Sequence, residues 1–128
     1  MRNSLAILSG LALFVWPAIA SEPASDDPLH PSVEFGAQVY KDVCAHCHGI
    51  NMVNAGTSSY DLRKWPQDDR ERFQNSVLYG RGDMPAWGDA LFPGELEALW
   101  AYVVTRGGTE DLPPELADEF ADLPGHGS

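Results

Sequence analysis

The sequence predicts a small all-α fold in which three main helices are joined by long loops. Three segments carry apolar residues at helical spacing, and no two segments have the alternating pattern that predicts paired strands. The chain has 128 residues, a length that allows one domain with a single core. A hydrophobic content of 44% and a charged content of 21% are typical of a globular protein.

The first two helices are predicted from apolar periodicity and from residues that favour helix ends. The first covers residues 33–47, and its apolar positions are Phe35, Val39, Tyr40 and Val43. The second covers residues 68–79, because two aspartates suit its start and Gly80 suits its end.

The third predicted helix, over residues 93–106, has the clearest end signals. Pro93 suits the first turn, acidic residues at positions 95 and 97 favour the positive end of the helix dipole, and two glycines follow Arg106. Its apolar stripe consists of Leu96, Leu99, Trp100 and Val103.

The N-terminal residues 1–20 have the pattern of a signal peptide. Arg2 precedes an apolar run, and Ala18-Ile19-Ala20 is a small-x-small cleavage site. The run from residue 5 to residue 20 is only 16 residues long and is interrupted by glycine and proline, which is short for a membrane span. We therefore expect cleavage after Ala20, export out of the cytoplasm and no membrane span in the mature chain.

The remaining chain is expected to divide into an N-terminal arm (21–32), a domain (33–106) and an acidic, flexible C-terminal tail (107–128). An alternative for the tail is that Leu116, Phe120 and Leu123 form a helical stripe that lies on the domain or on a partner. Eight basic residues against 19 acidic ones give a net charge of −11, which argues against nucleic acid as a partner.

The two cysteines of the chain stand in the segment Cys44-Ala45-His46-Cys47-His48. A disulfide across so short a loop would add little stability, a redox dithiol would need a preceding strand, and a structural zinc site would lack ligands. Covalent haem attachment remains, because two thiols one helical turn apart can each add to a vinyl group while the next imidazole binds the iron. The motif therefore predicts one haem c, bound through Cys44 and Cys47, with His48 as an iron ligand.

A second axial ligand is predicted at Met84. Met52 follows His48 by only four residues, too few for the chain to reach the other face of the porphyrin, whereas Met84 follows it by 36. Met84 also lies in a glycine-containing loop and precedes Pro85, which restricts the backbone. We expect Met52 to lie in the core or on the surface.

Together these segments resemble class I c-type cytochromes. The resemblance rests on the haem motif, on the segment from Gly80 to Pro85 and on Leu99-Trp100-Ala101-Tyr102-Val103, and it implies that a glycine, here Gly36, permits close crossing of the first and last helices. The Gly-Pro-x-Leu segment usual after the haem motif is absent, so the carbonyl that receives the His48 N–H stays undetermined.

The segments 52–56, 60–66 and 84–89 are further similar to the periplasmic cytochromes that accept electrons from quinoprotein alcohol dehydrogenases of the ethanol or methanol type. This resemblance implies a pyrroloquinoline quinone (PQQ) dehydrogenase as electron donor, with a downstream cytochrome or terminal oxidase as acceptor. In the same loop, Arg63 and Trp65 carry N–H donors suited to the haem propionates. The alternative, weighed equally, is that the Arg63 side chain is solvated and that Trp65 only forms part of the pocket wall.

The sequence thus favours a monohaem cytochrome c that carries single electrons and is not itself an enzyme. Three alternatives remain open. They are a gas-binding or sensor haem protein with an open sixth iron site, a cytochrome c that serves a different periplasmic dehydrogenase, and, if haem were absent, a dithiol oxidoreductase.

Overall fold

The computed structural model describes residues 29–54 and 59–123. The predicted signal peptide, most of the predicted N-terminal arm and the last residues of the tail lie outside the described residues. Among the helices that are described, none is long and apolar enough to cross a membrane.

The described chain is helical, as the sequence predicts. Its longer elements are α1 (Pro31–Val39), the π-helical η1 (Tyr40–Cys44), α2 (Ala45–His48), α3 (Arg70–Tyr79), α4 (Glu95–Val104) and α5 (Pro114–Glu119). Short 3₁₀ turns, η2 (Ile50–Met52), η3 (Leu62–Lys64) and η4 (Gly88–Ala90), interrupt the loops. In the part of the chain that is described, the only β-type pairing is an isolated bridge between Arg81 and Met84.

The first predicted helix corresponds to α1, η1 and α2, which follow one another without a break. It starts at Pro31, inside the predicted arm, because the side chain of His30 accepts a hydrogen bond from the Ser32 N–H and a proline suits the first helical turn. The sequence predicted no π-helical stretch at Tyr40–Cys44. Such stretches are frequent at functional sites, and this one ends at the first cysteine of the haem motif.

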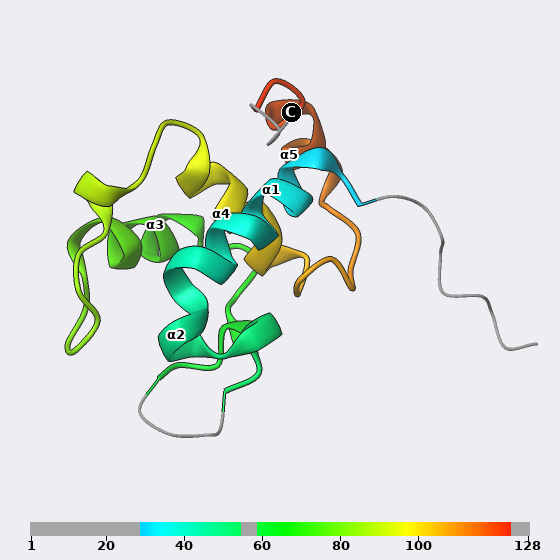
Figure 1. The fold of residues 1–128 in the computed structure, drawn as a ribbon. Helices are drawn as coiled ribbons and strands as arrows, with labels where there is room; N and C mark the ends of the chain where they lie inside the picture. The colour runs from blue at the N-terminus through cyan, green and yellow to red at the C-terminus, as the bar shows by residue number, and fades with distance from the viewer. Residues whose placement is uncertain (1–28, 55–58, 124–128) are drawn as a thin grey trace, which may run out of the picture.

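The centre of the fold is the crossing of α1 and α4 (Figure 1). Gly36 allows it: a Cβ atom there would lie 2.6 Å from the carbonyl carbon of Ala98 and 2.9 Å from Cβ of Tyr102, distances that real side chains do not occupy. Next to the crossing, the rings of Tyr40 and Tyr102 lie 5.0 Å apart. The expected role of Gly36 therefore has a steric basis in the structure.

Helix α3 packs against α4 through aromatic side chains. The ring of Phe73 lies 5.3 Å from that of Trp100 and 5.8 Å from that of Trp65. Phe73, Trp100 and Trp65 are all buried. These contacts hold the 60–66 loop and α3 against the last long helix, and they leave a hollow between that loop, α2 and the loop around Met84.

The described part of the C-terminal tail differs from the flexible segment that the sequence favoured. Phe120 is only 2% exposed, and Leu112, Leu116 and Leu123 are partly buried against the core. Arg70 of α3 forms an ion pair with Glu119 at 2.8 Å, and its guanidinium lies 5.3 Å from the centre of the Phe120 ring. Apolar burial at every third or fourth residue outweighs the acidic composition here, as the alternative interpretation of the tail expected.

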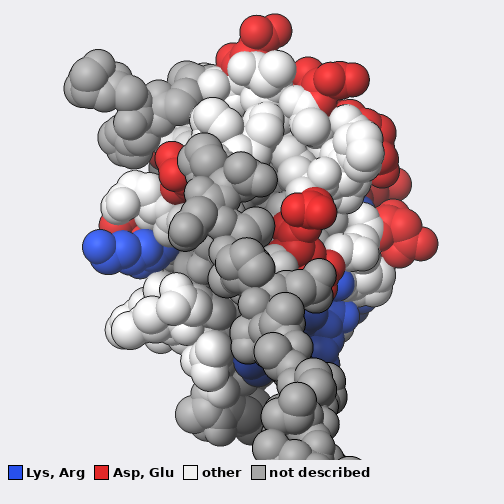
Figure 2. Space-filling model, turned by 90° about the vertical axis from the view of Figure 1, so that its right-hand side faces the viewer, with Lys and Arg blue, Asp and Glu red and all other residues white. Residues whose placement is uncertain are grey.

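Charges are unevenly placed on the surface. On the face drawn in Figure 2, acidic side chains gather over the upper and right-hand parts, and the Lys and Arg side chains visible there lie lower.

Candidate functional site

A cavity of about 580 Å³ lies between α2, α3, α4 and the loop around Met84. Its volume falls within the range of small-molecule and cofactor sites. The cavity wall includes Cys44, Cys47, His48, Met84 and Trp65, so five of the six predicted site residues come together around one space. Arg63, the sixth, does not line it.

The two cysteines lie at the junction of η1 and α2 and are free thiols. Cys44 is partly buried and Cys47 is exposed. Burial, and secondly the neighbouring Cys47, raise the pKa of the Cys44 thiol to about 12. Both side chains line the cavity, where their thiols are available for covalent attachment.

The structure identifies the hydrogen-bond partner of His48 that the sequence left open. Nδ1 of His48 lies 3.1 Å from the backbone carbonyl oxygen of Tyr60. Because a carbonyl oxygen only accepts, Nδ1 must carry the proton, which leaves the lone pair on Nε2 for a metal. Fixing an imidazole through its second nitrogen is the usual way in which proteins orient a histidine ligand.

A tight hairpin holds Met84. The N–H of Arg81 donates to the carbonyl of Met84, and the N–H of Met84 donates to the carbonyl of Arg81, both at 3.0 Å. Gly80 enters the hairpin with φ of +75°, and a Cβ atom there would lie 2.5 Å from the Met84 carbonyl oxygen. Met52, by contrast, is 0% exposed in the core and does not line the cavity.

Arg63 and Trp65 use their donors within the protein. Two guanidinium nitrogens of Arg63 bind the Asp61 carboxylate, each at 2.9 Å, and this pairing lowers the pKa of Asp61. The indole N–H of Trp65 donates to the Asp69 carbonyl at 3.0 Å. A propionate contact from either side chain would require these bonds to exchange, whereas the Trp65 ring already serves as a wall of the cavity.

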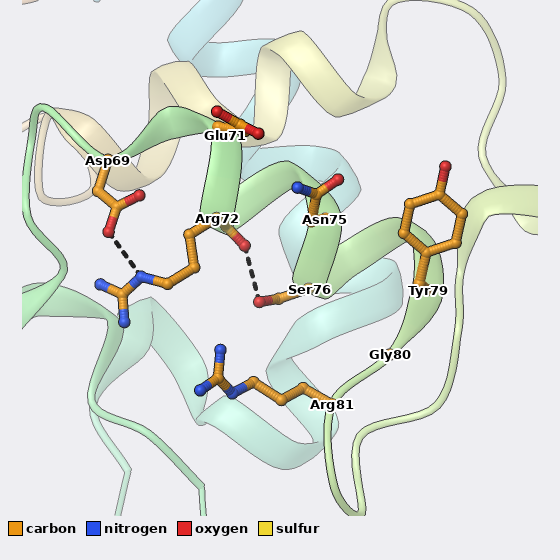
Figure 3. A pocket seen from close by; sticks show the side chains of 8 residues that line it. All are labelled: Asp69, Glu71, Arg72, Asn75, Ser76, Tyr79, Gly80 and Arg81. Atoms are coloured by element: carbon orange, nitrogen blue, oxygen red, sulfur yellow. Dashed lines mark hydrogen bonds and ion pairs between the residues drawn. The ribbon is translucent and has the colours of Figure 1, made fainter.

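Two cationic residues that the sequence analysis did not single out also line the cavity: Arg72 of α3 and Arg81 of the Met84 hairpin. Both also line a shallower cleft of about 520 Å³ beside it (Figure 3). A signal for Arg81 was present, since it lies inside the segment that predicts the methionine ligand. Arg72 gave no comparable signal, because only the packing of α3 shows which of its faces borders the cavity.

The chemistry of this cavity fits haem c. It combines two free thiols one helical turn apart, an imidazole with an available Nε2, and a thioether. The buried residues Leu62, Leu99 and Val103 add apolar wall that suits a porphyrin.

Comparison with known proteins agrees with this fit. The family model for the cytochrome c oxidase, cbb3-type, subunit III matches residues 31–103. Cytochrome c6 of Microcystis aeruginosa is 37% identical over 75 residues, which is 56% of this chain and 93% of that protein.

Two dehydrogenases of Pseudomonas putida are also similar. Quinohemoprotein alcohol dehydrogenase ADH-IIG is 32% identical over 108 residues, and ADH IIB is 38% identical over 77 residues. The match covers 77% of this chain but only 14% of ADH-IIG, and 58% of this chain but 11% of ADH IIB. A solved structure of ADHIIG aligns over 91% of this chain and 17% of its own, with 26% identity and a TM-score of 0.52.

Cytochromes c bind haem c covalently, with iron at its centre, and the predicted cytochrome c fold and cofactor are confirmed by the family match. The chain belongs to the cytochrome c family, in the group described as cytochrome c oxidase, cbb3-type, subunit III.

Proposed function

We propose that this cytochrome c is a periplasmic one-electron carrier that accepts electrons from a PQQ-dependent alcohol dehydrogenase and passes them to a downstream cytochrome or terminal oxidase. The observation that carries the proposed donor is the similarity over 77% of the chain to a quinohemoprotein alcohol dehydrogenase. In this proposal the donor is a separate protein, which the carrier meets by diffusion.

The proposed roles of the cavity residues follow from their chemistry. Cys44 and Cys47 would hold the haem through thioether bonds, and His48 and Met84 would bind its iron. When bound, the haem iron supplies a couple that takes up and releases one electron. If His48 and Met84 both bound the iron, the protein would leave no iron position open for a substrate or a gas, which favours a carrier over an enzyme or a sensor.

Two features of the described residues support this ligand pair. The Tyr60 carbonyl accepts from Nδ1 of His48, so that Nε2 is the nitrogen free for the iron, and the hairpin hydrogen bonds keep Met84 on the cavity wall. Met/His ligation raises the reduction potential of haem, which suits a protein that takes electrons from a reduced quinone cofactor.

Intact-mass measurement of the denatured, purified protein tests export and covalent attachment together. We expect the mass of a chain that begins at Ser21 plus one haem. A mass equal to that of the bare polypeptide, with two free thiols, would contradict the carrier function, because that function requires bound haem. A chain that carries haem but retains its first 20 residues would contradict only the proposed processing.

A reduction assay tests the donor. Oxidised cytochrome is mixed with a quinoprotein alcohol dehydrogenase from the same organism, a short-chain alcohol is added, and haem reduction is followed by absorbance. An unrelated dehydrogenase with its own substrate serves as the control. We expect faster reduction by the quinoprotein and a rate that depends on ionic strength, because charges act mainly on encounter. Equal rates with both enzymes at every ionic strength would reject the donor and leave the electron-carrier function intact.

A further inference from the structure

Two arginine side chains from different parts of the chain face the same space. Arg72 projects from α3 and Arg81 from the Met84 hairpin, and Figure 3 shows both side chains extending into the same space beside α3. Both residues line the cavity that contains Cys44, Cys47, His48 and Met84.

The Arg72 side chain is held by two contacts, and its terminal N–H donors are left unused. Its Nε donates to the Asp69 carboxylate at 2.6 Å, and its guanidinium lies 4.4 Å from the centre of the Trp65 ring. Among the described residues, its terminal nitrogens have no further partner, and the Arg81 side chain makes no hydrogen bond or ion pair. The two guanidinium groups therefore offer unused N–H donors to one region of the cavity wall.

This arrangement suits an anion. Two positive charges border one space, and Asp69 compensates only one of them. The other ionisable side chains on the cavity wall are Tyr40, Tyr60, Asp83, the two cysteines and His48. Asp83 is exposed and has no ion pair to either arginine among the described residues. Guanidinium groups bind carboxylates through paired N–H donors, and a carboxylate therefore fits this site.

We propose that Arg72 and Arg81 form the binding site for the propionate carboxylates of the haem. This inference rests on the proposed haem attachment at Cys44 and Cys47, and it adds residues that carry the other end of the cofactor. Arg63 is a weaker candidate, because it does not line the cavity and its guanidinium already binds Asp61.

The proposal has an electrostatic consequence. Positive charge near the haem favours the reduced iron, which carries one positive charge fewer than the oxidised iron. Removing one arginine charge should therefore shift the ratio of oxidised to reduced protein, at a fixed solution potential, two- to tenfold toward oxidised; a tenfold shift corresponds to about 59 mV for one electron.

The test compares Arg72→Gln and Arg81→Gln with Arg70→Gln in the mature holoprotein. Arg70 is a matched control, because it lies on α3 and loses the same charge, yet it pairs with Glu119 and lines neither hollow. Arg72→Lys, which keeps the charge but not the paired donors, completes the set. Arg81 is exposed on a hairpin, so its variant should fold even if Arg72→Gln does not.

Two readouts separate a propionate contact from a merely structural effect. The first is the midpoint potential at pH 7 and constant salt. The second is the redox-induced infrared difference spectrum of protein whose haem carries ¹³C in the propionate carboxyl groups, which identifies the carboxylate bands directly.

We expect the labelled carboxylate bands to move in Arg72→Gln and Arg81→Gln, to move less in Arg72→Lys and to stay in place in Arg70→Gln, with the potential lowered in the first two. Bands that stay in place in both glutamine variants, in protein with covalent haem, would overturn the proposal and leave the proposed function standing. Absence of covalent haem in the parent protein would instead refute the proposed function. If the bands stay and only reduction by the dehydrogenase slows, the arginines bind carboxylates of the partner, which also overturns the proposal.

Discussion

Replacing Gly36 by alanine should destabilise the protein, although alanine is the better helix former. The new methyl group would lie 2.6 Å from the Ala98 carbonyl carbon and 2.9 Å from Cβ of Tyr102, while ordinary contacts begin at 3.4 Å. The obstacle at Ala98 is backbone, so no side-chain rotation can remove the clash. The Ala98 carbonyl oxygen would lie closer still, so helices α1 and α4 would have to separate by more than about an ångström to restore ordinary contact.

The expected magnitude follows from two opposing effects. Overpacking of a closed core costs about 1–3 kcal/mol, and a backbone clash belongs at the upper end of that range. The helix propensity of alanine returns about 1 kcal/mol. The net loss in the free energy of unfolding should be about 2 kcal/mol, which for a domain of this size lowers the melting temperature by roughly 8–16 °C.

Guanidinium unfolding of the holoprotein, followed by far-ultraviolet circular dichroism, measures this loss. Gly82→Ala is the control, because no atom lies within 4 Å of the position that a methyl group on Gly82 would take, although Gly82, unlike Gly36, has a positive φ of +57°. It should cost only the strain of left-handed backbone, about 1 kcal/mol. A Gly36→Ala variant that is as stable as the parent, or more stable than Gly82→Ala, would refute the argument that close contact at the α1–α4 crossing requires glycine.

Four further substitutions test the iron ligand, the tail and the 60–66 loop. Met84→Ala should open the sixth iron site, so that the reduced protein binds carbon monoxide readily and its reduction potential falls. Met52→Ala should leave carbon monoxide binding weak but lower the free energy of unfolding by about 2–5 kcal/mol, because Met52 is 0% exposed. Phe120→Ala should cost about 3 kcal/mol in chemical unfolding with little change in potential, since Phe120 is 2% exposed and does not line the cavity. Asp61 has a pKa lowered by its hydrogen bond with Arg63, so it should add stability above its usual pKa of 3.8 and lose that contribution as the pH falls through the lower folded-state value. The difference in unfolding free energy between the parent and Asp61→Asn, measured from pH 6 downward, should therefore vanish in acid.

Each of these expectations has a contrary outcome. Carbon monoxide binding in Met52→Ala but not in Met84→Ala would exchange the two methionine assignments. A Phe120→Ala variant as stable as the parent would favour the flexible tail that the sequence predicted over a tail that packs on the domain. A stability difference between the parent and Asp61→Asn that persists unchanged into strong acid would mean that the Asp61 charge contributes nothing.

Local patterns in the sequence predicted most of the scaffold. Residues 70–79 and 95–104 are helical within a few residues of the predicted ends, because apolar periodicity and end-capping residues act over one or two helical turns. The haem motif was equally visible, since both thiols and the imidazole must lie within one turn of each other. The separation of Met52 from Met84 required only chain length and the reach of an extended backbone.

The tertiary structure decided what depends on segments far apart in the chain. The His48 imidazole is oriented by the carbonyl of Tyr60, 12 residues away, and Arg70 holds Glu119, 49 residues away. Arg72 and Arg81 border the cavity, while Arg63 turns to Asp61, because packing of α3 and of the 60–66 loop determines which side chains face the hollow. By itself, the sequence of this protein determined its helices, its haem motif and its family, since these depend on short-range geometry. Only the tertiary structure decided which arginine side chains border the cavity and that Phe120 lies in the core. Both outcomes depend on which distant surfaces of the chain meet and exclude water.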